Sequence, residues 1–218
     1  MNRMFLAVLP FLGPAGAAYF LWSHYDQLPA RFPVHFNAVA QADRWVGKSP
    51  GAVFMVPAIA AGSLALMLAI LLMIQYSSRP LRGETAVRRH RLNVNMLLVV
   101  MWMVSFLTTV AALLPVIPQP IAARLIWASV AGLLLTVAGF AIPLMRMSTE
   151  PSEEGDGTPA GCWKLGVFYY NPADPSLMVE KRCGLGYTLN FGNRRSWGLM
   201  ALMLVIVLAP LFFILRMK

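Results

Sequence analysis

The chain has 218 residues, of which 58% are hydrophobic and 12% are charged, and its formal net charge is +9. Soluble domains are about 45–50% apolar, so this composition excludes an ordinary soluble protein and predicts one embedded in a membrane. The positive charge alone would fit nucleic-acid binding, but the sequence contains no aromatic platform or recognisable module of that class. We therefore expect no nucleic-acid partner.

Five long segments contain no Asp, Glu, Lys or Arg, and each holds roughly the 20 residues that a spanning helix needs. We predict an all-α integral membrane protein whose transmembrane helices lie near residues 4–23, 52–75, 94–115, 125–145 and 197–215. Its domains would be a four-helix membrane domain (1–145) with a structured outer loop (24–50), an acidic flexible linker (146–160), a small cytoplasmic module (161–195) and the fifth helix (196–218).

The first apolar run has some features of a secretory signal peptide. Arg3 precedes it, and Ala15 and Ala17 form an A-x-A-like cleavage site. Because apolar residues continue to Trp22, we expect the segment to be retained as a helix. Cleavage would leave the rest of the topology unchanged.

Basic residues are distributed unevenly between the segments that connect the five helices. With the N-terminus in the cytoplasm, 12 of the 18 Lys and Arg residues fall in inner segments, including the basic loop from Ser77 to Arg91. Cytoplasmic segments are enriched in Lys and Arg, so we predict the N-terminus inside and the C-terminus outside. Cys162 and Cys183 then lie in the cytoplasm, where we expect reduced thiols.

The outer loop, residues 24–50, is too long for a simple helix connection. Pro29 and Pro33 favour extended backbone before them, and residues 34–37 alternate like a short strand that would place His35 and Asn37 on one face. Imidazole and carboxylate groups bind metals, so His35 and Asp43 are candidate metal ligands, although capping, turns and hydrogen bonding would use the same residue types. The candidate ligand-binding residues are His35, Phe36, Asn37, Asp43, Trp45 and Lys48.

The cytoplasmic module has strand-like residues over 161–170, a turn over 171–175, and a predicted partner strand over 177–182. At roughly 35 residues it is too small to be stable alone, so we expect it to pack on the inner membrane face or on the helices. The candidate partner-binding residues are Trp163, Tyr169, Tyr170, Asn171, Asp174, Lys181, Arg182 and Asn190.

The predicted spans contain no ionisable residue. Ion-coupled transport usually requires such groups within the membrane, and a serine-type hydrolase needs a base beside its nucleophile. We therefore expect the Ser and Thr residues of the spans to bond to their own helix backbone. We expect no cofactor and favour a non-enzymatic protein, while an enzyme that uses the outer loop stays an open alternative.

Two segments carry a resemblance to a known family. The pattern LPxxFPVHFNxxAxxDRWxxK, from Leu28 to Lys48, resembles the N-terminal uncharacterised domain of SdpI-type bacterial membrane immunity proteins, with Ala40 where that family usually has Gly. The stretch from Trp163 to Asn193 is similar to a second uncharacterised domain that often accompanies the first. The resemblance implies a multi-pass protein of the bacterial cytoplasmic (inner) membrane. Its founding member confers immunity to a secreted peptide toxin and tethers a cytoplasmic repressor.

Three functional hypotheses follow. The leading one is a non-enzymatic membrane protein whose outer loop recognises a peptide toxin or envelope component and whose module contacts a cytoplasmic protein. The first alternative is a metal-dependent envelope enzyme or factor that uses the His35 loop. The second is a transporter subunit. The identity of the ligand and the oligomeric state stay open.

Overall fold

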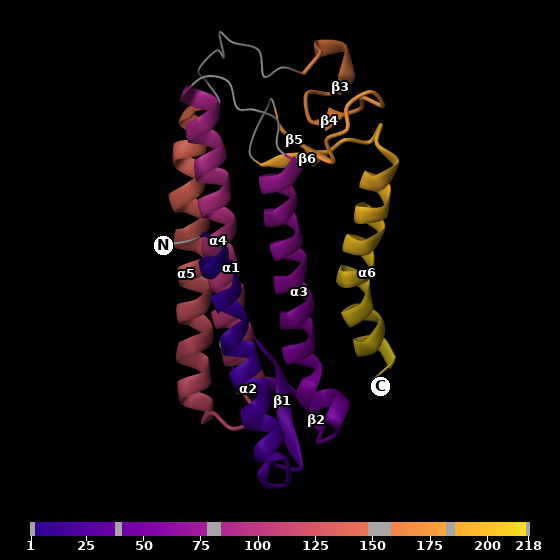
Figure 1. Ribbon diagram of the computed structural model, residues 1–218. Helices are drawn as coiled ribbons and strands as arrows, with labels where there is room; N and C mark the ends of the chain where they lie inside the picture. Colours follow the sequence, from indigo (N-terminus) through magenta and orange to yellow (C-terminus); the bar gives the residue numbers. More distant parts are fainter. Residues whose placement is uncertain (1–2, 38–40, 78–83, 148–157, 182–185, 217–218) are drawn as a thin grey trace. The chain divides into compact units, whose positions relative to one another are not determined.

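The computed structural model describes residues 3–37, 41–77, 84–147, 158–181 and 186–216. Figure 1 shows that helices dominate them. The helices are α1 (Arg3–Val8), α2 (Leu12–Ser23), α3 (Pro50–Ser77), α4 (Glu84–Ala112), α5 (Gln119–Met147) and α6 (Arg194–Arg216), with short 3-10 turns η1 (Leu9–Phe11), η2 (Tyr25–Gln27) and η3 (Ala160–Cys162). The strands are β1 (Arg31–Phe36), β2 (Ala42–Gly47), β3 (Trp163–Lys164), β4 (Phe168–Tyr169), β5 (Met178–Glu180) and β6 (Tyr187–Leu189).

Four helical segments are long and apolar enough to cross a membrane: Arg3–Ser23, Pro50–Gln75, Val87–Ala112 and Pro120–Pro143. They confirm the first four predicted spans and indicate a multi-pass membrane protein. The fifth predicted span, 197–215, is helical within α6 but is not one of these four. Its crossing of the membrane stays a prediction, as does the orientation of the chain.

The helices extend beyond the charge-free runs that predicted them. Helix α4 begins at Glu84, so residues 84–91 of the predicted basic loop are helical. Arg, Lys and Glu are good helix formers, and a charge-free run therefore marks the part that can cross a membrane rather than the ends of the helix. Residues 78–83 of that loop and 148–157 of the predicted linker lie outside the described residues.

By internal contacts the chain divides into two compact units. One unit comprises Met1–Ala65 with Leu98–Thr136, and the other comprises Leu66–Leu97 with Val137–Lys218.

In the first unit, a serine on α4 compensates for a proline in the first helical run, Arg3–Ser23. Proline has no N–H, so Pro14 cannot donate to the carbonyl of Pro10 four residues earlier. The Ser105 hydroxyl donates to that carbonyl instead, at 2.5 Å. The two helices approach closely here, because a Cβ on Gly13 would lie 2.6 Å from Thr109 Oγ1. Ser and Thr side chains often satisfy backbone groups that proline leaves unpaired in membrane helices.

Four other hydroxyls of the predicted spans bond within their own helices, as expected. Thr108, Thr109, Ser129 and Thr136 each donate to the carbonyl four residues earlier, at 2.7–2.8 Å. Ser105 departs from this prediction because it serves the carbonyl of Pro10.

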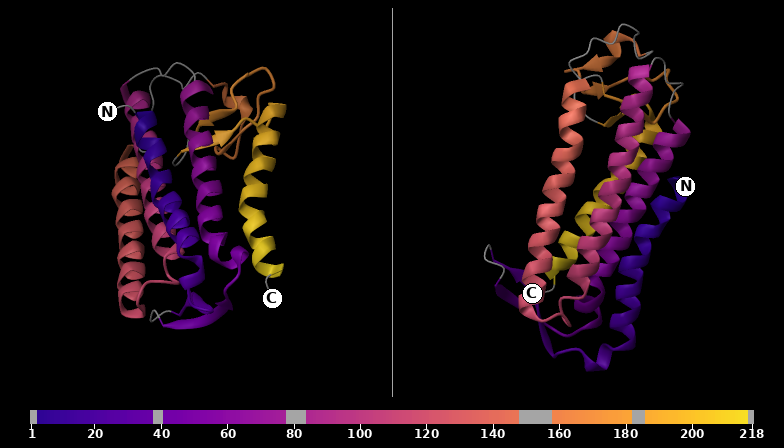
Figure 2. Two further views of the ribbon diagram at one scale, coloured as in Figure 1. Left: turned by 60° about the horizontal axis from the view of Figure 1, so that its bottom comes forward. Right: turned by 90° about the vertical axis from the view of Figure 1, so that its left-hand side faces the viewer.

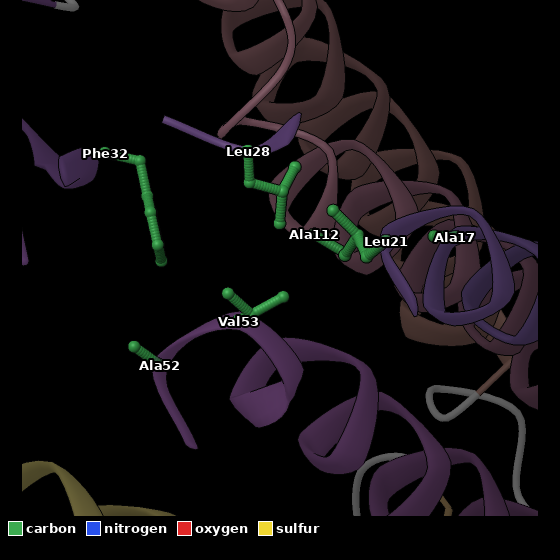
Figure 3. Close-up of a cluster of buried hydrophobic side chains, with 7 residues drawn as sticks. All are labelled: Ala17, Leu21, Leu28, Phe32, Ala52, Val53 and Ala112. Atoms are coloured by element: carbon green, nitrogen blue, oxygen red, sulfur yellow. The ribbon is translucent and has the colours of Figure 1, made fainter. Parts of the chain in front are cut away.

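The core of the first unit joins the strands to three helices. Its buried members come from α2, β1, α3 and α4, with Leu28 just before β1, as Figure 3 shows: Ala17, Leu21, Leu28, Phe32, Ala52, Val53 and Ala112. Helix α3 enters this core with a defined start, since Ser49 Oγ accepts a hydrogen bond from Ala52 N–H and Pro50 occupies the first helical position. The strands are therefore held against the helix ends by apolar packing.

In the second unit, the segment between α5 and α6, described over 158–181 and 186–193, forms a small module. Figure 2 shows its short strands next to the first turns of α6. Strand β3 pairs with β4, and β5 pairs with β6, in two separate antiparallel sheets. The predicted pairing of residues 177–182 with residues 161–170 is therefore wrong. The turn over 171–175 leads instead into β5, which takes β6 as its partner, while Tyr169 of β4 forms a bridge with Asn190.

Candidate functional site

The β1–β2 hairpin is the structured part of the predicted outer loop. Phe32 lies opposite Val46, and both contact the core of the first unit. The register shifts between Pro33 and His35 and again between His35 and Phe36. Bulges of this kind re-aim side chains, and here they flank the histidine that the sequence singled out.

Lys48 fixes the hairpin to the end of the first helical run. Its ammonium group donates to the carbonyl oxygens of Tyr25, Asp26 and Leu28, each at 3.3 Å, and lies 5.4 Å from the centre of the Tyr25 ring. A cation is stabilising where a helix ends on unpaired carbonyls. Lys48, predicted as a ligand-binding residue, is thus a positioning residue for the hairpin.

Replacing Lys48 by methionine is expected to lower the free energy of unfolding of the first unit by about 1–2 kcal/mol, because three carbonyls lose a charged donor. Arg44→Met is the matched control: it removes a cation from the exposed surface of the same hairpin, and we expect a change below about 0.5 kcal/mol. Hydrogen exchange of the hairpin amides in detergent measures both. Equal effects of the two variants would contradict the conclusion that Lys48 holds the hairpin on the end of the helix.

His35 and Asp43 form an exposed pair at the bulge. His35 Nδ1 lies 2.5 Å from Asp43 Oδ1, and the side chains are 56% and 43% exposed. A carboxylate on one ring nitrogen fixes the tautomer and the orientation of an imidazole. Nε2 is then the nitrogen available to a ligand. The structure thus brings together the two residues that the sequence proposed as metal candidates.

The other predicted hairpin residues have different roles. Asn37 closes the turn after β1: its N–H donates to the Gln41 carbonyl, and its Oδ1 accepts from Gln41 N–H, both at 2.9 Å. Strand β1 ends at Phe36, so Asn37 does not share a strand face with His35 as predicted. Phe36 is half-buried, while Trp45 is exposed. Within the described part of the chain, no three His, Cys, Asp or Glu residues are grouped so as to hold a metal.

The module is organised around the side chain of Asn190, which is fully buried. Its Oδ1 accepts hydrogen bonds from the N–H groups of Asn171 and Gly192, at 3.0 and 3.1 Å. Its Nδ2 donates to three carbonyl oxygens, those of Asn171, Asp174 and Ser176, at 2.9–3.2 Å. One amide therefore bonds to five backbone groups, four of them within residues 171–176 and the fifth at Gly192.

A second set of bonds joins Tyr169 to the same turn. The Tyr169 hydroxyl donates to Asp174 Oδ2 at 2.9 Å and accepts from Asn171 Nδ2 at 3.0 Å, while Asp174 Oδ1 accepts from Ser176 N–H. The Trp163 ring packs on that of Tyr169, with centroids 5.1 Å apart. The interior of the module is therefore built largely from polar side chains that hydrogen-bond to one another, beside the ring of Trp163.

Four predicted partner-binding residues thus lie inside the module, where a partner would not reach them: Trp163, Tyr169, Asp174 and Asn190. Their side chains hold the module together and are not available as contacts. Tyr170 is exposed, Asn171 and Lys181 are half-buried, and Arg182 lies outside the described residues, as does Cys183.

The module is also fastened to α4 by polar contacts that sequence reasoning missed. His90 Nδ1 lies 2.6 Å from the Tyr187 hydroxyl, and Asn93 Nδ2 donates to Glu180 Oε1 at 3.2 Å. Burial raises the pKa of Tyr187, and the nearby Glu180 carboxylate raises it further, so the hydroxyl keeps its proton at neutral pH. The expected packing of the module on the helices is thereby confirmed.

Asn93 Oδ1 leaves this contact incompletely satisfied. Among the described residues it is a buried acceptor without a hydrogen-bond partner, which costs about 1–3 kcal/mol. A bound water would remove that cost.

Two family models match parts of the chain. Residues 15–61 match a domain of unknown function (DUF1648), and residues 172–197 match a family of unknown function (DUF5808). The first match contains the whole hairpin with Lys48, and the second contains β5, β6, Asn190 and the start of α6. Both are uncharacterised families typical of membrane proteins, and neither is specific to immunity proteins. No match was found among curated proteins or among solved structures.

Proposed function

We propose that this protein is a non-enzymatic, multi-pass protein of the bacterial cytoplasmic membrane whose β1–β2 hairpin recognises a peptide or an envelope component. The observation that carries the proposal is the exposed His35–Asp43 pair, presented on a hairpin that Phe32 and Lys48 hold rigidly. A preorganised site loses little entropy on binding. The resemblance to SdpI-type proteins favours an immunity or signalling role.

The surface chemistry of the hairpin favours a peptide. Beside the imidazole and carboxylate, it exposes the indole of Trp45 (49%) and the side chain of Val34 (40%). A two-stranded sheet also has edges whose backbone groups can pair with an extended peptide. Backbone pairing would give affinity, and the His35–Asp43 pair and Trp45 would give specificity.

We assign the second proposed role, contact with a cytoplasmic protein, to the module. Its support is the turn around Asn171, which is held rigidly by Asn190 while Pro172 and Ala173 are exposed. Lys181 adds a basic group at the end of β5. The hydrogen bonds to α4 would transmit a change in that helix to the module.

Photo-crosslinking in living cells tests the hairpin. Benzoyl-phenylalanine replaces Val34 in the full chain, and cells receive either the peptide fraction of their own culture medium or purified muropeptides. We expect one covalent adduct of defined mass, reduced about tenfold or more by His35→Ala with Asp43→Asn, since a lost charged hydrogen bond costs about 1.5–3 kcal/mol. The matched control carries the crosslinker at Gln27, exposed in η2. An adduct that forms equally there, or survives the double variant, would refute the proposal.

A metal-dependent role is the alternative that the same pair supports, because carboxylates commonly orient metal-binding histidines. Metal analysis of the purified full chain distinguishes this metal-dependent role from peptide recognition. Stoichiometric metal that is lost on His35→Ala and on Asp43→Ala would favour the alternative. Metal-free protein with an unchanged unfolding transition would remove it.

A further inference from the structure

A strip of aromatic side chains runs over the module to the first turn of α6. The ring of Phe168 meets that of Phe191 edge-on at 5.9 Å, and Phe191 meets Trp197 in the same way at 5.7 Å. Trp197 Nε1 also donates to the Phe191 carbonyl at 3.0 Å. Phe168 and Trp197 are nevertheless 48% and 51% exposed. The strip is therefore ordered by its own contacts while its outer surface is uncovered.

Alternation along β4 extends this exposed surface. Tyr169 is buried in the module, whereas Phe168 before it and Tyr170, directly after the strand, are both exposed, Tyr170 by 52%. The family match that covers the start of α6 includes Phe191 and Trp197.

The turn between β3 and β4 places a large apolar side chain at its tip at a conformational cost. Leu165 has φ of +54° and is 90% exposed. A left-handed conformation is unfavourable for leucine, whereas Gly or Asn adopts it readily. The turn itself requires positive φ here, as it does at Gly166 (φ of +69°), but it does not require a large apolar side chain, so the leucine at this tip points to a functional use.

Exposed basic residues neighbour this apolar surface in the sequence. Lys164 precedes Leu165, and Arg194 and Arg195 begin α6; all three are exposed. After Arg195, the chain has no charged residue until Arg216. Aromatic and basic side chains beside an apolar helix are the combination that settles at the surface of an anionic membrane.

We infer that the edge of the module formed by Leu165, Phe168, Tyr170 and Trp197 docks into the interface of an anionic lipid bilayer, with Lys164, Arg194 and Arg195 at the headgroups. This goes beyond the proposed function and does not depend on any ligand of the hairpin. It assigns Tyr170 to lipid rather than to a protein partner. Docking would fix the height of the module at the membrane surface.

A fluorescent amino acid at position 165 tests the docking in the full chain. The protein is reconstituted in nanodiscs of phosphatidylcholine with or without phosphatidylglycerol, and nitroxide-labelled lipids serve as quenchers. We expect blue-shifted, quenched emission with phosphatidylglycerol, weakened by high salt. Replacing Lys164, Arg194 and Arg195 by glutamine should lower the docked fraction about fivefold or more, since each basic residue near an anionic surface contributes about that factor in affinity.

The matched control carries the fluorophore at Ala173, an exposed site of the same module outside this edge, and should keep water-like emission. Protection of the Asn171 and Gly192 amides from exchange confirms that each variant is folded. Water-like, unquenched emission from position 165 in anionic nanodiscs would overturn the inference. So would an emission shift that requires an added soluble protein, or one that the glutamine substitutions leave unchanged.

Discussion

Asn190→Ala is expected to unfold the module while the helices stay intact. The substitution removes five hydrogen bonds at a fully buried position, among them those that the N–H groups of Asn171 and Gly192 donate to the side chain. Each buried group that stays unpaired costs about 1–3 kcal/mol, so we expect a loss of about 3–5 kcal/mol. Amide exchange between residues 168 and 192 should accelerate about a hundredfold or more.

Two further variants define what this result means. Asn95→Ala, at an exposed position of α4 in the same unit, should change exchange little. Asn190→Asp keeps the shape of the side chain but sets an oxygen against three carbonyl oxygens, so we expect it to destabilise at least as much as alanine. A benign Asn190→Asp variant would mean that the amide fills space rather than pairing the backbone.

The sequence was most informative where single residue types dominate the physics. Charge-free runs predicted five spans, because a charge inside hydrocarbon is costly whatever its neighbours are, and four of them are helices long and apolar enough to cross a membrane. Pro33 correctly indicated extended backbone in the outer loop. Strand β2 was missed because residues 42–47 include Ala, Asp and Gly, which have low strand propensity, and only pairing with β1 makes them extended.

The interior of the module could not be predicted in the same way. Polar residues such as Asp174 and Asn190 are usually exposed, and we placed them on the surface. A module with few regular hydrogen bonds must satisfy its loops by side chains, and this need drives both residues inside. The residues of the pairs His90–Tyr187 and Asn93–Glu180 are 97 and 87 positions apart in the sequence. No local sequence pattern predicts either contact.

The same reasoning bears on Gly192, where we expect alanine to destabilise the module by about 2–3 kcal/mol through overpacking. An added Cβ would lie 2.6 Å from Asn171 C and from Pro172 N. Both are backbone atoms of the turn that Asn190 holds, so neither can move away as a side chain would. Gly198→Ala is the matched control: a Cβ there meets nothing within 4 Å, and alanine in a helix should stabilise α6 by about 0.5–1 kcal/mol.

Stability changes of opposite sign for the two alanine substitutions, measured by amide exchange in the full chain, would show that the close backbone approach at Gly192 determines the effect. Equal stability changes at the two positions would contradict this explanation. Because Gly192 N–H donates to Asn190 Oδ1, the two sites share one network, and contacting sites are not additive. The double variant Asn190→Ala with Gly192→Ala should therefore lose clearly less than the sum of the single losses, since the first substitution already releases the turn against which the second would collide.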